Sequence, residues 1–360
     1  MLAKDTPHPD PLPASGAREQ TSHSPLRIGI VGLGRLGRRH AQNLAQRVPA
    51  AELVAACSLV ADELAWANDT LGVRNLYADY AALLGEAKVD AVFLVTPMSL
   101  HAEHIVQALW AGKHVFCEKP LALDLGQCRS VEAEAAQHPR LKVMIGYGRR
   151  FDPSYSDAYD KIRGGLIGEP FLVRSQNLDM NDPSGFFVRF APTSGGIFLD
   201  CSVHDIDLAR WFLGRPKPLR VFAAGTIAIH EGLREFGDVD NGVATCEFEG
   251  GKLACFYASR TMAHGHESST EIFGTKGRLA IGENPRLNRV EISDAHGVRN
   301  ECTPTFYERF EEAFLRETME FVQAVQDDRP PALTLSDATE ATRIGVALRE
   351  SLQTRRAIDL

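Results

Sequence analysis

The sequence lacks three features that would assign the protein to a specialised class. It has no basic excess, since 39 lysines and arginines stand against 47 aspartates and glutamates, a net charge of −8. This balance argues against a nucleic-acid partner or an anionic membrane surface, because both favour a basic face. No run reaches the ~20 apolar residues of a membrane span. None of the seven cysteines is spaced as C-x-x-C, and the odd count indicates reduced thiols in a cytoplasmic protein without a zinc site.

The length of 360 residues predicts two domains. Residues 1–25 are rich in proline and polar residues without apolar periodicity, which predicts a disordered tail that is not a signal peptide. From Leu26 to about Gly146, short apolar runs alternate with helical stretches, so we expect a doubly wound α/β domain with a parallel sheet. The expected strands are 27–31, 53–58, 91–96, 114–118 and 141–145, and the expected helices are 38–46, 61–71, 80–84, 102–111 and 127–137.

A G-x-G-x-x-G motif, Gly32-Leu33-Gly34-Arg35-Leu36-Gly37, follows the first of these strands. A tight turn alone could explain the glycines, but a strand before them and a helix after them favour dinucleotide binding. The first glycine permits the turn, the second lets the main chain approach a pyrophosphate, and the third lets the helix pack on the strand. The anion would bind the free N–H groups at the helix start.

The second strand ends in Ser58, where NAD-binding domains usually carry an acidic residue for the ribose hydroxyls. Serine removes a charge that would repel the 2′-phosphate of NADP, yet no basic residue follows before Asp62 and Glu63. Arg35 is the nearest candidate for that phosphate. The pattern favours NAD and leaves the use of NADP open.

Two further segments follow strands whose carboxyl ends face the ligand crevice of such a sheet. Thr96, Pro97, Leu100 and His101 are expected to line the cofactor, although His101 could equally cap or pack its helix. The next strand ends in Glu118-Lys119-Pro120, where the proline fixes the chain direction at Lys119. That lysine points either into the crevice or, as surface lysines commonly do, into solvent.

The glycine motif, the Thr96-Pro97 segment with His101, and Glu118-Lys119-Pro120 together resemble the Gfo/Idh/MocA oxidoreductases from Leu26 to Leu360. The resemblance implies an N-terminal Rossmann domain that binds a nicotinamide cofactor through these residues. It also implies a C-terminal α+β domain with a large open, mostly antiparallel sheet that carries the substrate. We expect a substrate and oligomerisation domain over 147–335, and a helix in 336–360 that packs back on the Rossmann domain.

The junction between the expected domains reads Arg149-Arg150-Phe151-Asp152-Pro153, similar to inositol dehydrogenase-like members. Asp152 is expected to cap a helix that starts at Pro153, and Arg150 to reach the cofactor or a polyol. Beyond it we expect a strand over 171–179 that brings Asn177 and Asp179 to the substrate, a loop over 181–194, and strands over 221–229, 242–249, 252–259, 269–273, 277–281 and 290–293. Helices are expected over 157–163, 306–325 and 336–352, the last capped by Ser336.

Residues 199–213 show the apolar spacing of an amphipathic helix that ends at Gly214. Asp200 and His204 lie four residues apart, hence on one face, where the carboxylate could orient the imidazole as a general base. An Asp–His pair on a helix is more often structural, but the family's D-x-x-x-H pattern falls at these positions. Asp205 and Asp207 are expected to be packing charges.

The resemblance to inositol dehydrogenase-like members implies hydride transfer between nicotinamide and a secondary hydroxyl of a cyclic polyol, with myo-inositol or a stereoisomer as first choice. His204 would remove the hydroxyl proton, Asp200 would hold its ring and Lys119 would donate a hydrogen bond to the oxygen; no metal is required. A sugar dehydrogenase, a non-catalytic NAD(P)H sensor and a biliverdin reductase-like enzyme are the alternatives. The family further implies a homodimer or homotetramer through the open sheet.

Overall fold

The computed structural model describes residues 24–282 and 286–360, so the expected N-terminal tail lies outside the described residues apart from its last two positions. A six-stranded parallel sheet forms the first domain, in the order β3-β2-β1-β4-β5-β6. Its strands are β1 (Leu26–Val31), β2 (Ala51–Cys57), β3 (Asn75–Tyr77), β4 (Ala91–Leu94), β5 (His114–Glu118) and β6 (Val143–Gly146). This order confirms the expected Rossmann domain.

The strands of this sheet are joined by helices, as parallel pairing requires. β1 and β4 are buried at almost every position, which explains their nearly unbroken apolar sequence. The sequence analysis missed β3, whose three residues are too few to show a pattern. The helices are α1 (Arg35–Gln46), α2 (Ala61–Leu71), α3 (Tyr80–Glu86), α4 (His101–Trp110) and α5 (Leu125–Gln137), with the 3-10 turn η1 (Met98–Leu100) before α4.

A seven-stranded sheet forms the core of the second domain, in the order β12-β11-β7-β10-β9-β8-β15. Only β7 and β10 pair in parallel, so the sheet is mostly antiparallel, as expected. Its strands are β7 (Pro170–Met180), β8 (Pro218–Thr226), β9 (Asn241–Phe248), β10 (Lys252–Met262), β11 (Glu267–Gly274), β12 (Gly277–Ile281) and β15 (Ile358–Asp359). A separate hairpin joins β13 (Ile292–Asp294) to β14 (Gly297–Arg299).

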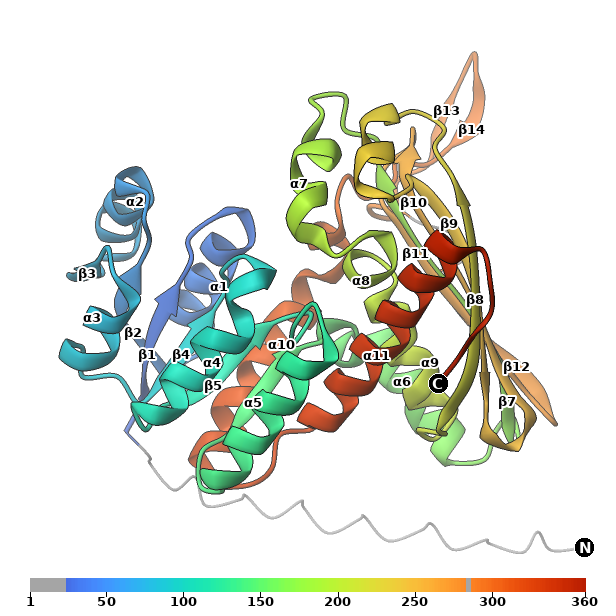
Figure 1. The fold of residues 1–360 in the computed structure, drawn as a ribbon. Helices are drawn as coiled ribbons and strands as arrows, with labels where there is room; N and C mark the ends of the chain where they lie inside the picture. Colours follow the sequence, from blue (N-terminus) through green and yellow to red (C-terminus); the bar gives the residue numbers. More distant parts are fainter. Residues whose placement is uncertain (1–23, 283–285) are drawn as a thin grey trace, which may run out of the picture.

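Helices cover the face of this sheet that looks toward the Rossmann domain (Figure 1). They are α6 (Pro153–Arg163), α7 (Phe186–Ser194), α8 (Ile197–Asp200), α9 (Val203–Phe212) and α11 (Leu335–Thr354). The short 3-10 turns of this domain are η2 (Gly148–Phe151), η3 (Glu231–Phe236) and η4 (Glu249–Gly251), the last of which connects β9 to β10. Asp152 caps α6 as expected, because its carboxylate accepts from the main-chain N–H groups of Ser154 and Tyr155.

Three expectations about helices are wrong. Residues 186–194 form α7 rather than a loop, despite Pro192 inside the helix. The helix expected over 199–213 is interrupted at Cys201 and Ser202, so Asp200 ends α8 while α9 begins after it. The cap of α11 is Thr334, whose side chain accepts from the N–H of Asp337, rather than Ser336.

Two C-terminal helices, rather than the last one alone, contact the Rossmann domain. α10 (Phe306–Gln326) packs on the Rossmann sheet, where Phe321 meets Phe93 and Phe116 edge-on at ring distances of 5.4 and 5.9 Å. α11 lies between the domains and contacts α5 on one side and α8, α9 and β8 on the other. The chain therefore returns to the first domain through α10, before the expected boundary. No helix in the described part of the chain is long and apolar enough to cross a membrane.

Candidate active site

The glycine turn after β1 has a closed and an open side. Gly32 has φ +91°, and a Cβ there would lie 2.3 Å from the Val95 carbonyl oxygen. A Cβ on Gly37 would lie 2.0 Å from the Gly32 carbonyl oxygen, so both positions exclude any side chain. Gly34 is exposed, with no heavy atom within 4 Å of where its Cβ would be. Close packing inside and open space outside are what a pyrophosphate at this turn needs.

The first turn of α1 offers free main-chain donors at the same place. Gly34 is its N-cap and makes no side-chain capping bond, so the N–H groups there are available to an anion. Leu33 is fully buried, so only its main chain can reach the crevice. Arg35 is exposed and lies over the rings of Phe186 and Phe306, at 5.7 and 5.4 Å. The residues present thus fit a dinucleotide at this turn, with Leu36 half-buried behind it.

An acidic group does stand at the end of β2, although it comes from α2. The Ser58 hydroxyl donates to Oε2 of Glu63 at 2.5 Å and accepts from the N–H of Val60 at 3.0 Å. The serine thereby holds the Glu63 carboxylate beside the strand end where NAD enzymes place their acid. The local negative charge opposes a 2′-phosphate and favours NAD.

His101 joins two loops rather than lining the crevice. Its ring is buried, and its nitrogens lie 2.7 Å from the Pro120 carbonyl oxygen and 2.9 Å from that of Thr96. The expected contact of its side chain with the cofactor is therefore wrong, because both nitrogens are engaged inside the protein. Of the same segment, Thr96 and Leu100 are half-buried and Pro97 is exposed, so they can reach a bound ligand.

Lys119 of the first domain contacts Asp200 of the second domain. It follows β5, and its Nζ donates to the main-chain carbonyl oxygen of Asp200 at 2.7 Å and lies 3.6 Å from Oδ1 of that residue. The Glu118 side chain points the other way, to His40 inside the domain, so it cannot contact the cofactor as expected. Pro120 is buried, and the peptide bond before it is cis.

Asp200 pairs with an arginine that the sequence analysis missed. Its Oδ2 accepts from Nη2 of Arg260 at 3.1 Å, and Nη1 of the same guanidinium donates to Asp238 at 2.9 Å. Arg260 is fully buried and lies over the ring of Phe187. Its position follows the buried alternation of β10, and a charged residue at an inward position was the available signal.

Among the described residues no hydrogen bond joins Asp200 to His204; the Asp200 carboxylate lies against Lys119 and Arg260 instead. The ring of His204 instead stands edge-on to Tyr147 at 6.0 Å, and its Nδ1 is buried without a partner in the described residues. Burial, together with the charges of Arg149 and Lys119, holds the pKa of His204 well below its ordinary value. The imidazole is therefore neutral near pH 7 and can accept a proton.

An imidazole–carboxylate pair does exist at the site, between other residues. Nδ1 of His266 lies 3.0 Å from Oδ1 of Asp179, and the His266 ring is buried against Phe306 and Phe310. Burial alone would raise the pKa of Asp179, but the bond from His266 and the charges of Arg260 and Lys119 outweigh it and lower that pKa. Asp179 thus presents an ionised carboxylate beside Cys201 of the Asp200 segment.

Arg150 and Asn177 lie in a buried charge network instead of the crevice. Arg150 binds both oxygens of Asp207, at 2.7 and 2.5 Å, and also Asp337 at 3.1 Å. Arg149 joins Asp205 to Asn177, at 2.9 and 2.6 Å. The contact expected between Arg150 and the cofactor or substrate is wrong, because two carboxylates occupy its guanidinium, and the amide oxygen of Asn177 is engaged as well.

Models of known protein families match both domains of the chain. The model of the oxidoreductase family with an NAD-binding Rossmann fold matches residues 26–147, and that of the GFO/IDH/MocA C-terminal domain matches residues 155–280. The chain belongs to the GFO/IDH/MocA oxidoreductase family. The glycine turn and Lys119 lie in the range matched by the first model, and Asp200 lies in the range matched by the second.

Individual relatives cover almost the whole chain. The scyllo-inositol 2-dehydrogenase (NAD(+)) of Bacillus subtilis is 35% identical over 93% of this chain and 96% of its own length. The myo-inositol 2-dehydrogenase of Thermotoga maritima is 34% identical over 93% of this chain and 98% of its own length. The crystal structure of scyllo-inositol dehydrogenase from Lactobacillus casei with bound NAD(H) and scyllo-inositol superposes with a TM-score of 0.90, at 39% identity over 93% of this chain and 99% of that one.

Proposed function

We propose that this protein is an NAD-dependent inositol 2-dehydrogenase, which oxidises one ring hydroxyl of myo-inositol or a stereoisomer to a ketone. The observation that carries the proposal is the 2.7 Å contact between Nζ of Lys119 and the main chain of Asp200. It brings a cation of the nucleotide-binding domain to the carboxylates and the imidazole of the other domain. The likeness to the inositol dehydrogenases named above supports the choice of substrate.

In this proposal the proton and the hydride leave the substrate by separate routes. Bound NAD would supply the hydride acceptor, held over the glycine turn by the main chain of Gly34 and the first turn of α1. His204 accepts the hydroxyl proton, since its lowered pKa keeps it neutral. Lys119 donates a hydrogen bond to the oxygen and stabilises the negative charge that develops there.

Asp200 has a different task from the one expected of it. Its carboxylate lies between the Lys119 ammonium and the Arg260 guanidinium, so it fixes the lysine and offers an acceptor to a second hydroxyl. The ionised Asp179 adds another acceptor nearby. Such a set of donors and acceptors suits a ring that carries many hydroxyl groups and rejects analogues that lack them.

The direct test is NADH absorbance with a panel of myo-inositol, scyllo-inositol, other polyols and sugars, each with NAD and NADP. We expect turnover with an inositol and NAD. Faster turnover with a sugar would replace inositol by the runner-up substrate. Binding of NADH without turnover of any substrate would overturn the enzyme proposal in favour of a sensor.

Two further expectations belong to this proposal. The sheet face away from the helices exposes Phe222, Val243 and Leu253, each more than two fifths accessible, and we propose that it joins subunits into a homodimer or homotetramer. Light scattering would test this, since a monomer contradicts it.

All seven cysteines are free thiols, which supports a cytoplasmic location.

A further inference from the structure

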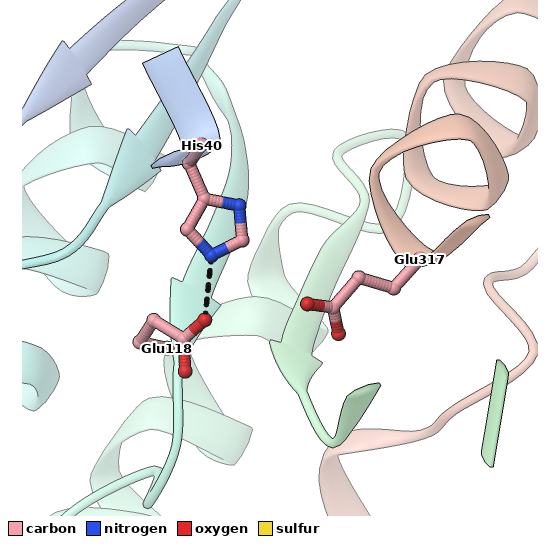
Figure 2. A group of neighbouring side chains, drawn as sticks. All are labelled: His40, Glu118 and Glu317. Carbon is pink, nitrogen blue, oxygen red and sulfur yellow. Dashed lines mark hydrogen bonds and ion pairs between the residues drawn. The ribbon is translucent and has the colours of Figure 1, made fainter. Parts of the chain in front are cut away.

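A cluster of three ionisable side chains is buried behind Lys119. His40 of α1, Glu118 of β5 and Glu317 of α10 each offer one ligand-type atom, and these atoms all lie within 4.8 Å of one another. Nε2 of His40 and Oε1 of Glu118 lie 2.7 Å apart, a hydrogen-bond distance. Figure 2 shows the Glu317 carboxyl group pointing at this pair from the opposite side. All three residues are at most 5% exposed, and none belongs to the crevice described above.

The surroundings of the cluster leave it almost no other polar contacts. The His40 ring packs against Phe93, Phe116 and Phe314, at centroid distances of 6.0, 5.5 and 5.7 Å. Two glycines of the domain junction make room for the carboxyl groups. A Cβ on Gly146 would lie 3.2 Å from Oε1 of Glu118, and one on Gly148 would lie 3.2 Å from Oε2 of Glu317.

Both oxygens of Glu317 are buried without a hydrogen-bond partner among the described residues. An ionised carboxylate in that position would have neither a donor nor a cation, and it would face the carboxylate of Glu118. Among the described residues no cation is hydrogen-bonded to it: Gly148 lies against the carboxyl group, and the neighbouring Arg149 and Arg150 bind Asp205 and Asp207. Burial, with the charge of Glu118, raises the pKa of Glu317 well above its ordinary value.

The cluster connects to the crevice through one hydrogen bond. The main-chain N–H of Lys119 donates to Oε2 of Glu118 at 3.2 Å. Glu118 is therefore hydrogen-bonded to His40 through one oxygen and accepts from the main chain of Lys119 with the other. The side chain of Lys119 then continues from this fixed main chain to Asp200.

We propose that the His40–Glu118 pair fixes the main chain of Lys119, and that Glu317 encloses the pair as an uncharged carboxylic acid. The three are positioning residues, and their effect on turnover rests on the proposed function of Lys119. A bound metal ion is the other arrangement that two carboxyl groups and an imidazole could serve. The 2.7 Å separation between Nε2 of His40 and Oε1 of Glu118 disfavours it, because two ligand atoms at about 2.0–2.1 Å from a tetrahedral metal lie roughly 3.4 Å apart.

The decisive comparison is between Glu317→Gln and Glu317→Ala. Glutamine keeps the shape of the uncharged acid, so we expect it to keep kcat within about twofold, whereas alanine opens a cavity and lowers kcat about tenfold or more. Glu312→Gln, on an exposed part of α10 where Glu312 pairs with Arg316, is the matched control and should behave as the wild type. Glu118→Gln should lower kcat about tenfold with little change in KM, because Lys119 acts mainly in the transition state.

Two readouts need no substrate. The infrared difference spectrum of wild type minus Glu317→Gln should contain the carbonyl band of a protonated carboxylic acid at pH 7. A folded-state pKa above the unfolded value of 4.5 means that the folded protein holds a proton that the unfolded chain has released, so stability falls as pH rises through that window. The difference in Tm between Glu317→Gln and the wild type should therefore increase in favour of the variant by about 2 °C per pH unit from pH 5 upward.

The inference is overturned if Glu317→Gln loses activity as alanine does, if the acid band is absent, or if the purified wild type holds a stoichiometric metal that the glutamine variant lacks. Those results leave inositol turnover by the wild type intact. Conversely, a wild type that turns over no inositol but shows the acid band would refute the proposed function while supporting the buried acid.

Discussion

Oδ2 of Asp200 accepts a hydrogen bond from Nη2 of Arg260 at 3.1 Å, although Asp200 stands four residues before the imidazole of His204. The guanidinium that holds it is fully buried and is itself fixed by Asp238. The same carboxylate lies 3.6 Å from Lys119, while His204 is buried and near the charges of Arg149 and Lys119 without a bond to Asp200. The site thus separates the group that accepts the proton from the carboxylate that orients the cation.

Replacing Asp200 by asparagine tests this separation. We expect Asp200→Asn to lower kcat about tenfold or more, because Lys119 loses its counter-charge. The acidic limb of the pH–rate profile should not move, since the carboxylate makes no bond to His204. A shift of that limb would restore the Asp–His couple that the sequence suggested.

Removing the ammonium group of Lys119 tests its role at the substrate oxygen. Lys119→Ala should lower kcat by about 10²-fold or more, the usual effect of losing one group that stabilises the transition state. The circular dichroism spectrum should stay near that of the wild type and Tm should fall only modestly, because one side chain with a single hydrogen bond to Asp200 is lost. Lys88→Ala, at an exposed position of the same domain, is the control; near-normal turnover in Lys119→Ala would end the assignment.

The pH dependence follows from the pKa of His204, which lies well below 6.5. Activity should persist below pH 6.5 and fall only when the imidazole becomes protonated. Over the window between its folded pKa and 6.5 the unfolded chain binds the proton and the folded protein does not, so stability falls as the pH falls. His204→Gln should remove the contribution of His204 to the change of unfolding free energy with pH. It should also lower kcat about 10²–10⁴-fold.

Other histidines have lowered pKa values too, so the comparison must be between wild type and variant. His104 and His114 remain in both proteins, and burial lowers the pKa of each. Urea unfolding at pH 5.5 and 7.5 measures the difference. Equal slopes for the two proteins would show that His204 is not a buried neutral base.

Arg150 provides a test of structure against binding. Arg150→Met leaves Asp207 buried without its paired cation, while Asp337 keeps Arg215, and we expect a loss of about 3–5 kcal/mol in the free energy of unfolding. If the variant folds, KM for NAD and for inositol should change less than about threefold. Arg234→Met, at a surface ion pair with Glu231, is the control; a large rise in KM with unchanged stability would return Arg150 to the binding site.

Cofactor preference depends on the carboxylate that Ser58 holds at the end of β2. Glu63→Gln removes its charge, and we expect kcat/KM with NADP to rise about tenfold, the equivalent of ~1.4 kcal/mol of repulsion. Activity with NAD should change little. Asp62→Asn, at the exposed neighbouring position, is the control, and an unchanged NADP/NAD ratio in Glu63→Gln would place the adenosine ribose elsewhere.

Local chemistry determined much of this protein from its sequence alone. The glycine turn is confirmed in detail, because Gly32 and Gly37 admit no Cβ and Gly34 faces open space. The α/β alternation, the cap at Asp152 and the open second sheet also follow from patterns within a few residues of one another. Apolar periodicity and turn residues act over such short spans, so they can be read directly along the chain.

Only the tertiary structure decided which charged groups meet. Lys119 and Asp200 stand 81 residues apart, Arg260 a further 60 beyond Asp200, and Arg150 and Asp337 stand 187 apart. A buried charged side chain needs an opposite charge nearby, and packing of the two domains determines which residue supplies it. The spacing of residues along the sequence does not show which residue that is. For the same reason a one-turn spacing predicted a contact between Asp200 and His204, whereas the Asp200 carboxylate pairs with Lys119 and Arg260.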